Sequence, residues 1–187
     1  MARPVSYDEA LRDRLLQVAA EMVDEKGADR IGLRDIAQAA GTSTSAVYSL
    51  FGGKAKLLVA VIEHGFDSFG AAQAKTESQG LRALGRTYRD WAKSNPALYR
   101  LMFGGALTSI DQCEPDAAVT SDAMLPLVRA LAARVPEEQV MTAAMTVWAQ
   151  VHGAVSLELA SVAHGVPDWD ALYEAMLDAM DRAFPGE

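Results

Sequence analysis

Hydroxyl-bearing side chains are concentrated in one short stretch of the chain. Residues 42–45 read Thr-Ser-Thr-Ser, Tyr48 and Ser49 follow within the next four residues, and Lys54 comes after two glycines. Serine and threonine both donate and accept hydrogen bonds, and here they fill the leading edge of a predicted short helix. The chemistry that this stretch offers is hydrogen bonding to a polar or anionic surface.

The motifs of common enzymes are missing from the sequence. It contains no His-Glu-x-x-His, no Gly-x-Ser-x-Gly and no complete dinucleotide-binding glycine pattern. The segment Gly53-Lys54-Ala55 is not a P-loop, because alanine replaces the hydroxyl that holds magnesium. His64, His152 and His164 are scattered along the chain and do not by themselves make a metal site. We therefore predict no enzyme, no catalytic residue, no metal site and no cofactor.

The hydroxyl-rich stretch falls in a predicted helix-turn-helix. Residues 33–40 have the period of a helix of two turns, Gly41 permits a left-handed turn, and Ser43 or Thr42 can cap a second helix that ends at Phe51. A small residue, Ala37, lets the two helices cross closely. This arrangement is typical of a unit that enters a nucleic-acid groove.

Further helices are predicted on both sides of this pair. Ser6 and Glu9 form a capping-box pattern for a helix that Gly27 ends. A helix from Lys54 to about Ala71 follows the pair, and the small and polar residues 73–80 predict a loose connection after it. First-turn prolines, Pro115 and Pro136, are expected to open two later helices. No segment alternates like a strand, so we expect an all-α protein of about nine helices.

The N-terminal pattern resembles the TetR family of bacterial repressors. The family motif of Asp-Ile-Ala, Gly and Tyr-x-x-Phe-x-x-Lys is present as 35–37, Gly41 and 48–54, and the resemblance covers residues 6–70. It implies a three-helix DNA-binding head over residues 1–53, a connecting helix over 54–72, and a C-terminal effector-binding and dimerisation domain over 73–187.

The resemblance also implies which residues contact DNA. Tyr48 and Lys54 would bind phosphates, with Lys54 at a helix N-terminus whose N–H groups also face the anion. Packing of Tyr48 in the core is the alternative. Leu50 stands where many family members have a histidine, and leucine cannot donate to a phosphate. The residues that would enter the major groove are Ser43, Thr44, Ser45, Ala46 and Ser49.

Base recognition needs residues outside the predicted recognition helix. That helix has no Arg, Lys, Asn or Gln, so it cannot make the bidentate contacts that read guanine and adenine. We expect Thr44 and Ala46 to touch thymine methyl groups. A charged side chain would then discriminate between base pairs, either Arg34 on the preceding helix or Arg3 on an N-terminal arm in the minor groove.

The charge distribution fits a local DNA-binding surface. The chain has 17 basic and 25 acidic residues, a net charge of -8, yet residues 30–56 have four cations against Asp35 alone. Residues 61–187 have nine cations against seventeen anions. The asymmetry predicts one end that faces DNA and one that avoids it, although ordinary scatter would also account for it.

The later part resembles the TetR-type C-terminal domain called WHG. It contains Tyr88-x-x-Trp91-Ala, an Asn-Pro-Ala-Leu-Tyr-Arg segment from Asn95, and Trp148-Ala-Gln-Val-His152-Gly153. The resemblance implies a small-molecule effector pocket, for which a neutral apolar effector is preferred. Plain core packing is the alternative for each candidate, and for His152 a structural role. The candidates are Trp91, Tyr99, Phe103, Met124, Met145, Trp148 and His152.

A homodimer is expected through the eighth and ninth predicted helices. The eighth has no charge over residues 139–157, and the ninth begins at Asp168. Small residues let helices approach closely, and an apolar helix needs cover on both sides. A monomer that buries its alanines internally is the alternative. A twofold dimer would hold two heads roughly 34–36 Å apart, one DNA turn, over a palindromic double-stranded operator.

Cellular location is predicted from cysteine use and from the N-terminus. Cys113 is the only cysteine and no secretory signal is recognised, which indicates the reducing cytoplasm. Six polar side chains within residues 139–157 argue against a membrane span. We therefore predict a cytoplasmic repressor whose operator binding a small molecule relieves. The alternative is a dimeric ligand-binding or interaction module of the same fold with weak or no specific DNA binding.

Overall fold

The computed structural model of the protein describes residues 9–104, 115–161 and 168–186. Within these ranges the chain forms helices and turns and no strand, which confirms the all-α prediction. Arg3, Ser6, Cys113 and His164 lie outside the described residues, so the predictions made for them have no structural counterpart.

The chain divides into two compact units. Residues 1–66 and 97–120 form the first, and residues 67–96 and 121–187 form the second. The first contains α1 (Glu9–Lys26), the 3₁₀ turn η1 (Ala28–Arg30), α2 (Leu33–Ala39), α3 (Thr44–Phe51) and most of α6 (Pro96–Phe103). α4 (Lys54–Thr76) begins in the first unit and ends in the second. We call α1–α3 with residues 54–66 the head.

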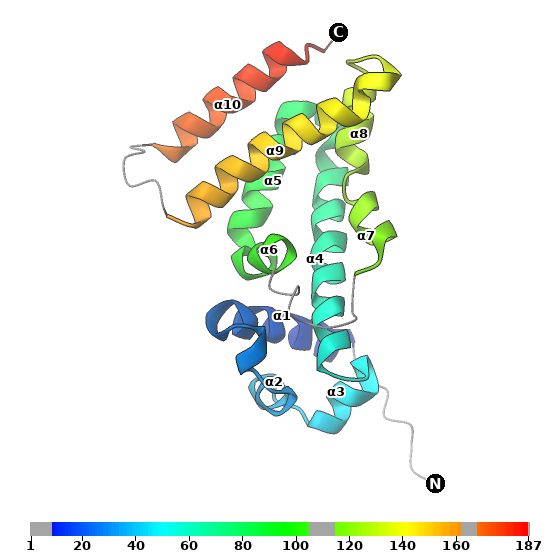
Figure 1. Ribbon diagram of the computed structural model, residues 1–187, viewed down its shortest axis with the longest axis vertical. Helices are drawn as coiled ribbons and strands as arrows, with labels where there is room; N and C mark the ends of the chain where they lie inside the picture. Colours follow the sequence, from blue (N-terminus) through cyan, green and yellow to red (C-terminus); the bar gives the residue numbers. More distant parts are fainter. Residues whose placement is uncertain (1–8, 105–114, 162–167, 187) are drawn as a thin grey trace. The chain divides into compact units, whose positions relative to one another are not determined.

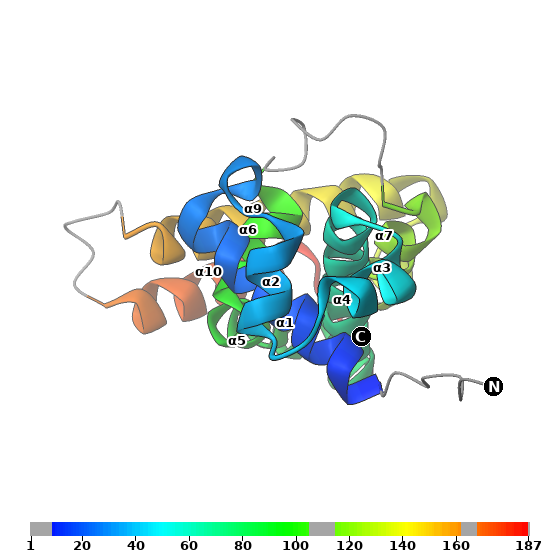
Figure 2. The ribbon, with the colours of Figure 1, turned by 90° about the horizontal axis from the view of Figure 1, so that it is seen from below.

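α1 supplies the apolar base on which the helix-turn-helix packs. Its buried residues recur at helical spacing, and α2 packs against it and then against α3 (Figure 2). Gly27 ends α1 with a φ of +83°, a conformation that favours glycine. The buried face of α1 consists of Leu15, Leu16, Ala19, Ala20 and Val23.

The turn between α2 and α3 is built from local signals. Gly41 has a φ of +69°, and no atom lies within 4 Å of the place where a Cβ would stand, so the backbone conformation alone favours glycine there. Ser43 caps α3, because its Oγ accepts a hydrogen bond from the Ala46 N–H at 3.2 Å. Ile36 and Val47 are fully buried between the helices. The predicted helix-turn-helix is therefore confirmed as a structure.

The predicted loose connection over residues 73–80 is wrong. α4 continues to Thr76, and the 3₁₀ turn η2 (Glu77–Gln79) follows it. Gln73 is 4% exposed and its Nε2 donates to the Leu84 carbonyl at 3.3 Å. Thr76 shares a hydrogen bond of 2.9 Å with Thr87. The polar residues of this stretch were predicted to form a loose connection, but the hydrogen bonds of Gln73 and Thr76 fasten α4 to α5.

α5 (Leu81–Ser94) is central to the second unit. It contacts α8 (Leu125–Ala132), α9 (Val140–Leu159) and α10 (Trp169–Ala183) (Figure 1). Gly85 leaves room for α10, since a side chain there would collide with Leu177. The Tyr173 hydroxyl donates to the Gly85 carbonyl at 2.7 Å. These contacts bury one face each of α9 and α10 and leave the other face of each open.

Arginines on α5 join it to the acidic residues of α9 and α10. Arg89 binds Glu158 through two hydrogen bonds of 2.7 Å and Asp170 at 2.6 Å, and its guanidinium lies over the Tyr173 ring. Arg82 and Arg86 both bind Glu174, and their hydrogen bonds lower the pKa of Glu174 to about 2. The same Glu158 contact raises the pKa of Arg89.

The region between α6 and α9 differs from its prediction. α7 (Ala117–Asp122) begins two residues after Pro115, so this proline does not lie in the first turn. A separate helix, α8, follows a turn at Ala123 and Met124, and its own first-turn proline is Pro126. Pro136 precedes the 3₁₀ turn η3 (Glu137–Gln139), which leads into α9.

Within the described ranges no single helix has both the length and the apolar composition that crossing a membrane requires. Only α3 taken together with residues 54–79, two segments bent by 62° to each other, meets that test of length and composition.

Candidate nucleic-acid interface and ligand cavity

The two residues predicted to bind phosphate lie where α3 meets α4. Tyr48 is 59% exposed, so the alternative of core packing is wrong. Gly52 and Gly53 have φ values of +77° and +145°, and they turn the chain between the two helices. Lys54 is the first residue of α4 and is half-buried. Both polar groups can therefore reach an anion outside the head.

The N-terminus of α4 adds backbone donors to this surface. The first hydrogen bond along α4 runs from the Leu57 N–H to the Gly53 carbonyl at 3.0 Å. The N–H groups of residues 54–56 precede it, and such first-turn groups have no carbonyl partner within a helix. They point outward with the positive end of the helix dipole, an arrangement that favours a phosphate. Lys56 is exposed in the same turn.

A shallow hollow lies between α2 and the start of α3. Its volume is about 620 Å³. Arg34 and Gln38 are both exposed and are four residues apart on α2, so they share one helix face. Asp35 does not neutralise this face by pairing, since its carboxylate accepts the Gly32 N–H at 3.0 Å. The residues lining the hollow are Arg34, Ala37, Gln38, Gly41, Thr42, Ser43 and Thr44.

The candidate residues on α3 separate into exposed and buried ones. Ser43, Ser45 and Ser49 are exposed and Thr44 is half-buried, so their hydroxyls are within reach of an external partner. Ala46 is 1% exposed. The prediction that Ala46 touches a thymine methyl is therefore wrong, because its own methyl packs inside the head.

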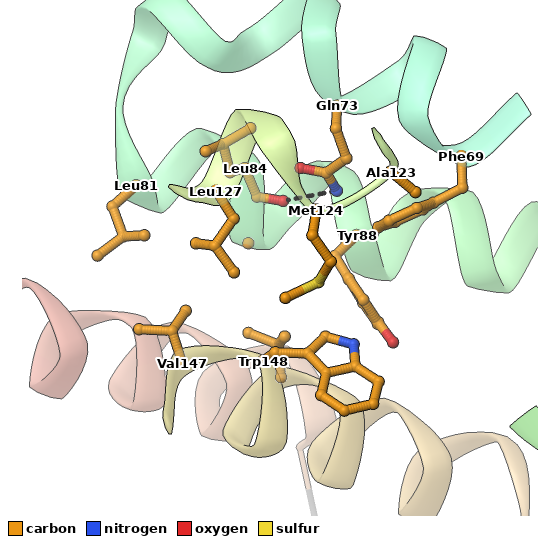
Figure 3. A pocket seen from close by; sticks show the side chains of 12 residues that line it. Phe69, Gln73, Leu81, Leu84, Tyr88, Ala123, Met124, Leu127, Val147 and Trp148 are labelled. Atoms are coloured by element: carbon orange, nitrogen blue, oxygen red, sulfur yellow. Dashed lines mark hydrogen bonds between the residues drawn. The ribbon is translucent and has the colours of Figure 1, made fainter. Parts of the chain in front are cut away.

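A second hollow is an apolar cavity inside the second unit, formed by α4, α5, α8, α9 and the turn before α8 (Figure 3). Its volume, counted as space open to the centre of a water molecule, is about 30 Å³. That is room for one or two waters, so a larger ligand requires the cavity to widen. No charged residue lines it. The lining residues are Phe69, Gln73, Leu81, Leu84, Gly85, Tyr88, Ala123, Met124, Leu127, Val147, Trp148 and Val151.

Two of the seven predicted pocket residues, Met124 and Trp148, line this cavity. Trp91 is 7% exposed and donates from Nε1 to Ser68 at 3.1 Å, away from the lining. Tyr99 and Phe103 belong to the first unit, where their ring centroids are 5.1 Å apart. Met145 is 46% exposed on α9. These four residues are absent from the lining of this cavity, and their role in ligand binding stays a prediction.

His152 lies behind the cavity wall. Its Nδ1 is 3.0 Å from the Tyr88 hydroxyl, its Nε2 is 3.4 Å from Ser156 Oγ, and its ring stacks beside Trp148 at 5.2 Å. Burial lowers the pKa of His152 because the charged ring loses water. The hydrogen-bonded structural role that was predicted as an alternative describes this geometry, while His152 itself is absent from the lining.

Comparison with known proteins identifies the family. Residues 15–61 match the profile described as bacterial regulatory proteins, tetR family, and residues 81–180 match the profile of the tetracyclin repressor-like C-terminal domain. The chain belongs to the TetR family. TetR-family proteins are DNA-binding transcriptional regulators and not enzymes, and this chain is a member of that class. The finer WHG assignment stays a prediction.

Individual TetR-family and related proteins support the same fold. The nucleoid occlusion factor SlmA of Haemophilus influenzae is 31% identical over an alignment of 103 residues, and the match covers 51% of this chain. This match spans 47% of SlmA, about half of its length. The crystal structure of the regulatory protein SCO4313 has a TM-score of 0.79 at 24% identity, covering 96% of this chain and 98% of that one. A TetR family regulator from Marinobacter aquaeolei VT8 has a TM-score of 0.72 at 21% identity, covering 96% and 98%.

Sequence reasoning missed two glutamines in this TetR-family chain. Gln38 lines the hollow of the head, and its place four residues after Arg34 on one short helix was a signal that could have found it. Gln73 lines the cavity, but it was assigned to a loop. Only the continuation of α4 past Ala71 places Gln73 on a buried face, and its polar neighbours obscured that continuation.

Proposed function

We propose that this TetR-family protein is a repressor that binds a palindromic operator as a homodimer and loses DNA affinity when a small molecule fills the cavity of the second unit. The observation that carries the proposal is the exposed Tyr48 beside the glycine turn that opens α4. An exposed phenol hydroxyl beside the N-terminus of a helix is placed to donate a hydrogen bond to the same anion that the first N–H groups of the helix favour.

The phosphate contacts come from Tyr48, Lys54 and the first N–H groups of α4. A phenol hydroxyl donates one hydrogen bond, and the ammonium group adds a charge-assisted one. Leu50 is half-buried and donates none. The backbone donors of residues 54–56 supply hydrogen bonds that do not depend on side-chain identity.

Base recognition is assigned to α2 as much as to α3. Arg34 can bind guanine through two hydrogen bonds, and Gln38 can bind adenine in the same way. Both line the hollow with Thr44, at the edge of the recognition helix. Thr44, Ser45 and Ser49 then supply weaker contacts that position α3 in the groove.

The proposed dimer uses the open faces of α9 and α10. Met141 is 61% exposed, Met145 46%, Leu157 50% and Leu172 39%. The exposed positions of α9 between Met141 and Leu157 include no charged residue. An apolar face of this kind is stabilised by a second copy of the same face across a twofold axis. Ala144, by contrast, is fully buried within one chain and does not contribute.

Relief of repression is assigned to α4. The helix carries Lys54 at its first residue and Phe69 and Gln73 on the cavity wall, about 22 and 28 Å further along at 1.5 Å per residue. A ligand that widens the cavity moves these residues, and a continuous helix transmits the movement to Lys54. The ligand must bind the DNA-free form more tightly than the DNA-bound form for affinity to fall.

The test is a binding titration with a labelled duplex from the region upstream of the protein's own gene and a scrambled duplex of equal length. We expect the upstream duplex to bind at least about 1000-fold more tightly, as specific regulators do. Equal affinity for both duplexes would favour the ligand-binding module without specific DNA recognition. Compounds that raise the melting temperature are then added to the complex, where release of DNA supports the repressor mechanism.

A further inference from the structure

Gln73 is a buried polar residue in a mainly apolar wall. It is 4% exposed, and in ranges 9–104, 115–161 and 168–186 it is the only residue classed as both buried and polar or charged. Its Nε2 donates to the Leu84 carbonyl at 3.3 Å. A carbonyl only accepts, so the amide nitrogen must face Leu84 and the amide oxygen Oε1 must point elsewhere.

The Oε1 atom of Gln73 is left without a donor. Among the residues that the structure describes, no N–H or O–H group donates to it. Every side-chain nitrogen or oxygen that is itself fully buried there has a partner, so Oε1 must border open space. Gln73 is one of the side chains that line the cavity (Figure 3). A buried acceptor with no donor costs free energy, and a ligand donor would recover it.

The hydrogen bond to Leu84 does not by itself require a glutamine. Leu84 lies inside α5, where backbone carbonyls are already paired along the helix. The other polar lining residues have partners within the unit. The Tyr88 hydroxyl is 3.0 Å from His152 Nδ1, and the Trp148 ring lies tilted beside the His152 ring, with 5.2 Å between their centroids. The acceptor oxygen of Gln73 is a polar atom of a lining residue to which no described group donates.

We propose that the cavity binds a neutral, mainly apolar molecule that carries one hydrogen-bond donor, and that this donor bonds to Oε1 of Gln73. The inference rests on the proposed function, because it takes the cavity as the effector site and names the effector's chemical class. An anion or a cation finds no opposite charge in the lining. Met124, Leu127 and Trp148 are the half-buried lining side chains, and their movement widens the present volume of about 30 Å³.

The experiment compares indole with benzofuran, two bicyclic molecules of nearly equal shape of which only indole has an N–H donor. Calorimetric titrations use the full chain without DNA, as wild type, as Gln73→Met and as Gln79→Met, an exposed glutamine on η2 that serves as the control. We expect wild type and Gln79→Met to bind indole about tenfold more tightly than benzofuran, the effect of one buried hydrogen bond. In Gln73→Met the ratio should fall to about one.

Three outcomes would overturn the inference: equal binding of both molecules to wild type, a preference that survives Gln73→Met, or no binding of either molecule. A crystal structure of wild type with indole tests the contact without any variant, and an indole N–H that faces a group other than Oε1 also contradicts it. Failure of the proposed function gives a different result. In that case indole binds with the expected preference, but the affinity for the upstream duplex does not change.

Discussion

The head and the second unit hold their candidate residues in opposite ways. In the head these side chains are on the surface, with Tyr48 59% exposed on α3 and Arg34 exposed on α2. In the second unit Gln73 and Tyr88 are each 4% exposed and are hydrogen-bonded to other helices. Substitutions in the head should therefore change DNA affinity and leave stability intact, whereas substitutions around the cavity should change both.

The largest effect is expected from Arg89→Met in the second unit. Arg89 is 11% exposed and holds Glu158, which is 12% exposed, and its loss leaves a carboxylate with Lys93 as the remaining partner. We expect the free energy of unfolding to fall by about 3 kcal/mol, as for a broken buried ion pair. Urea denaturation measures this loss of free energy.

The control is Arg86→Met, which removes the ion pair with Glu174. The Arg86 side chain is 54% exposed, so its loss should lower the free energy of unfolding by less than about 1 kcal/mol. Equal losses in the two variants would contradict the contrast between buried and exposed contacts.

Ala46→Leu tests the one recognition-helix residue that the structure moves into the core. Three extra carbons at a position that is 1% exposed should lower the free energy of unfolding by about 2 kcal/mol through overpacking. The same change at the exposed neighbour, Ser45→Leu, should stay within about 0.5 kcal/mol. Thermal unfolding of both variants measures the two losses of free energy. If Ser45→Leu is the more damaging, the assignment of inner and outer faces on α3 is wrong.

The head was predictable because its signals are local. Gly41, the Ser43 cap and the apolar residues Ile36 and Val47 lie within twelve residues, and each acts on its immediate neighbours. The cavity was not, because its wall joins residues from α4, α5, α8 and α9. Helical spacing indicates that Tyr99 and Met145 lie on an apolar helix face. It does not indicate which other helix that face packs against. Met124 was found by residue type, although it lies in a turn that no periodic pattern indicated.

Arg34→Ala should affect binding alone. We expect it to weaken binding to the upstream duplex by about 1–2 kcal/mol per head and to relax the preference for one base pair. Gln38→Ala should do the same at a different base pair. Selection of binding sites from a random duplex library measures both changes. The exposed Arg30 just before α2 provides the matched control as Arg30→Ala, and loss of selectivity there in place of Arg34 would refute the assignment.

The smallest effect is a pH dependence in the second unit. The pKa of His152 in the folded protein is below its ordinary value of 6.5, because burial disfavours the charged ring. As pH falls below 6.5, the unfolded chain therefore takes up a proton that the folded chain resists, and the free energy of unfolding decreases. His152→Gln should make this decrease shallower between pH 6.5 and 5. Identical pH profiles for wild type and the variant would show that the ring is not held in its neutral form.

The most direct test of the central claim is the salt dependence of DNA binding. The affinity for the upstream duplex is measured from 50 to 200 mM salt for wild type, Tyr48→Phe, Lys54→Gln and the control Lys75→Gln, which changes an exposed lysine near the end of α4. Each lost phosphate contact lowers the slope of log K against log salt by about 0.9. A dimer with two heads therefore predicts that Lys54→Gln lowers it by about 2, that Tyr48→Phe weakens binding at every salt concentration, and that Lys75→Gln changes neither. Unchanged slope and affinity in both head variants would contradict the claim that the head holds DNA through the junction of α3 and α4.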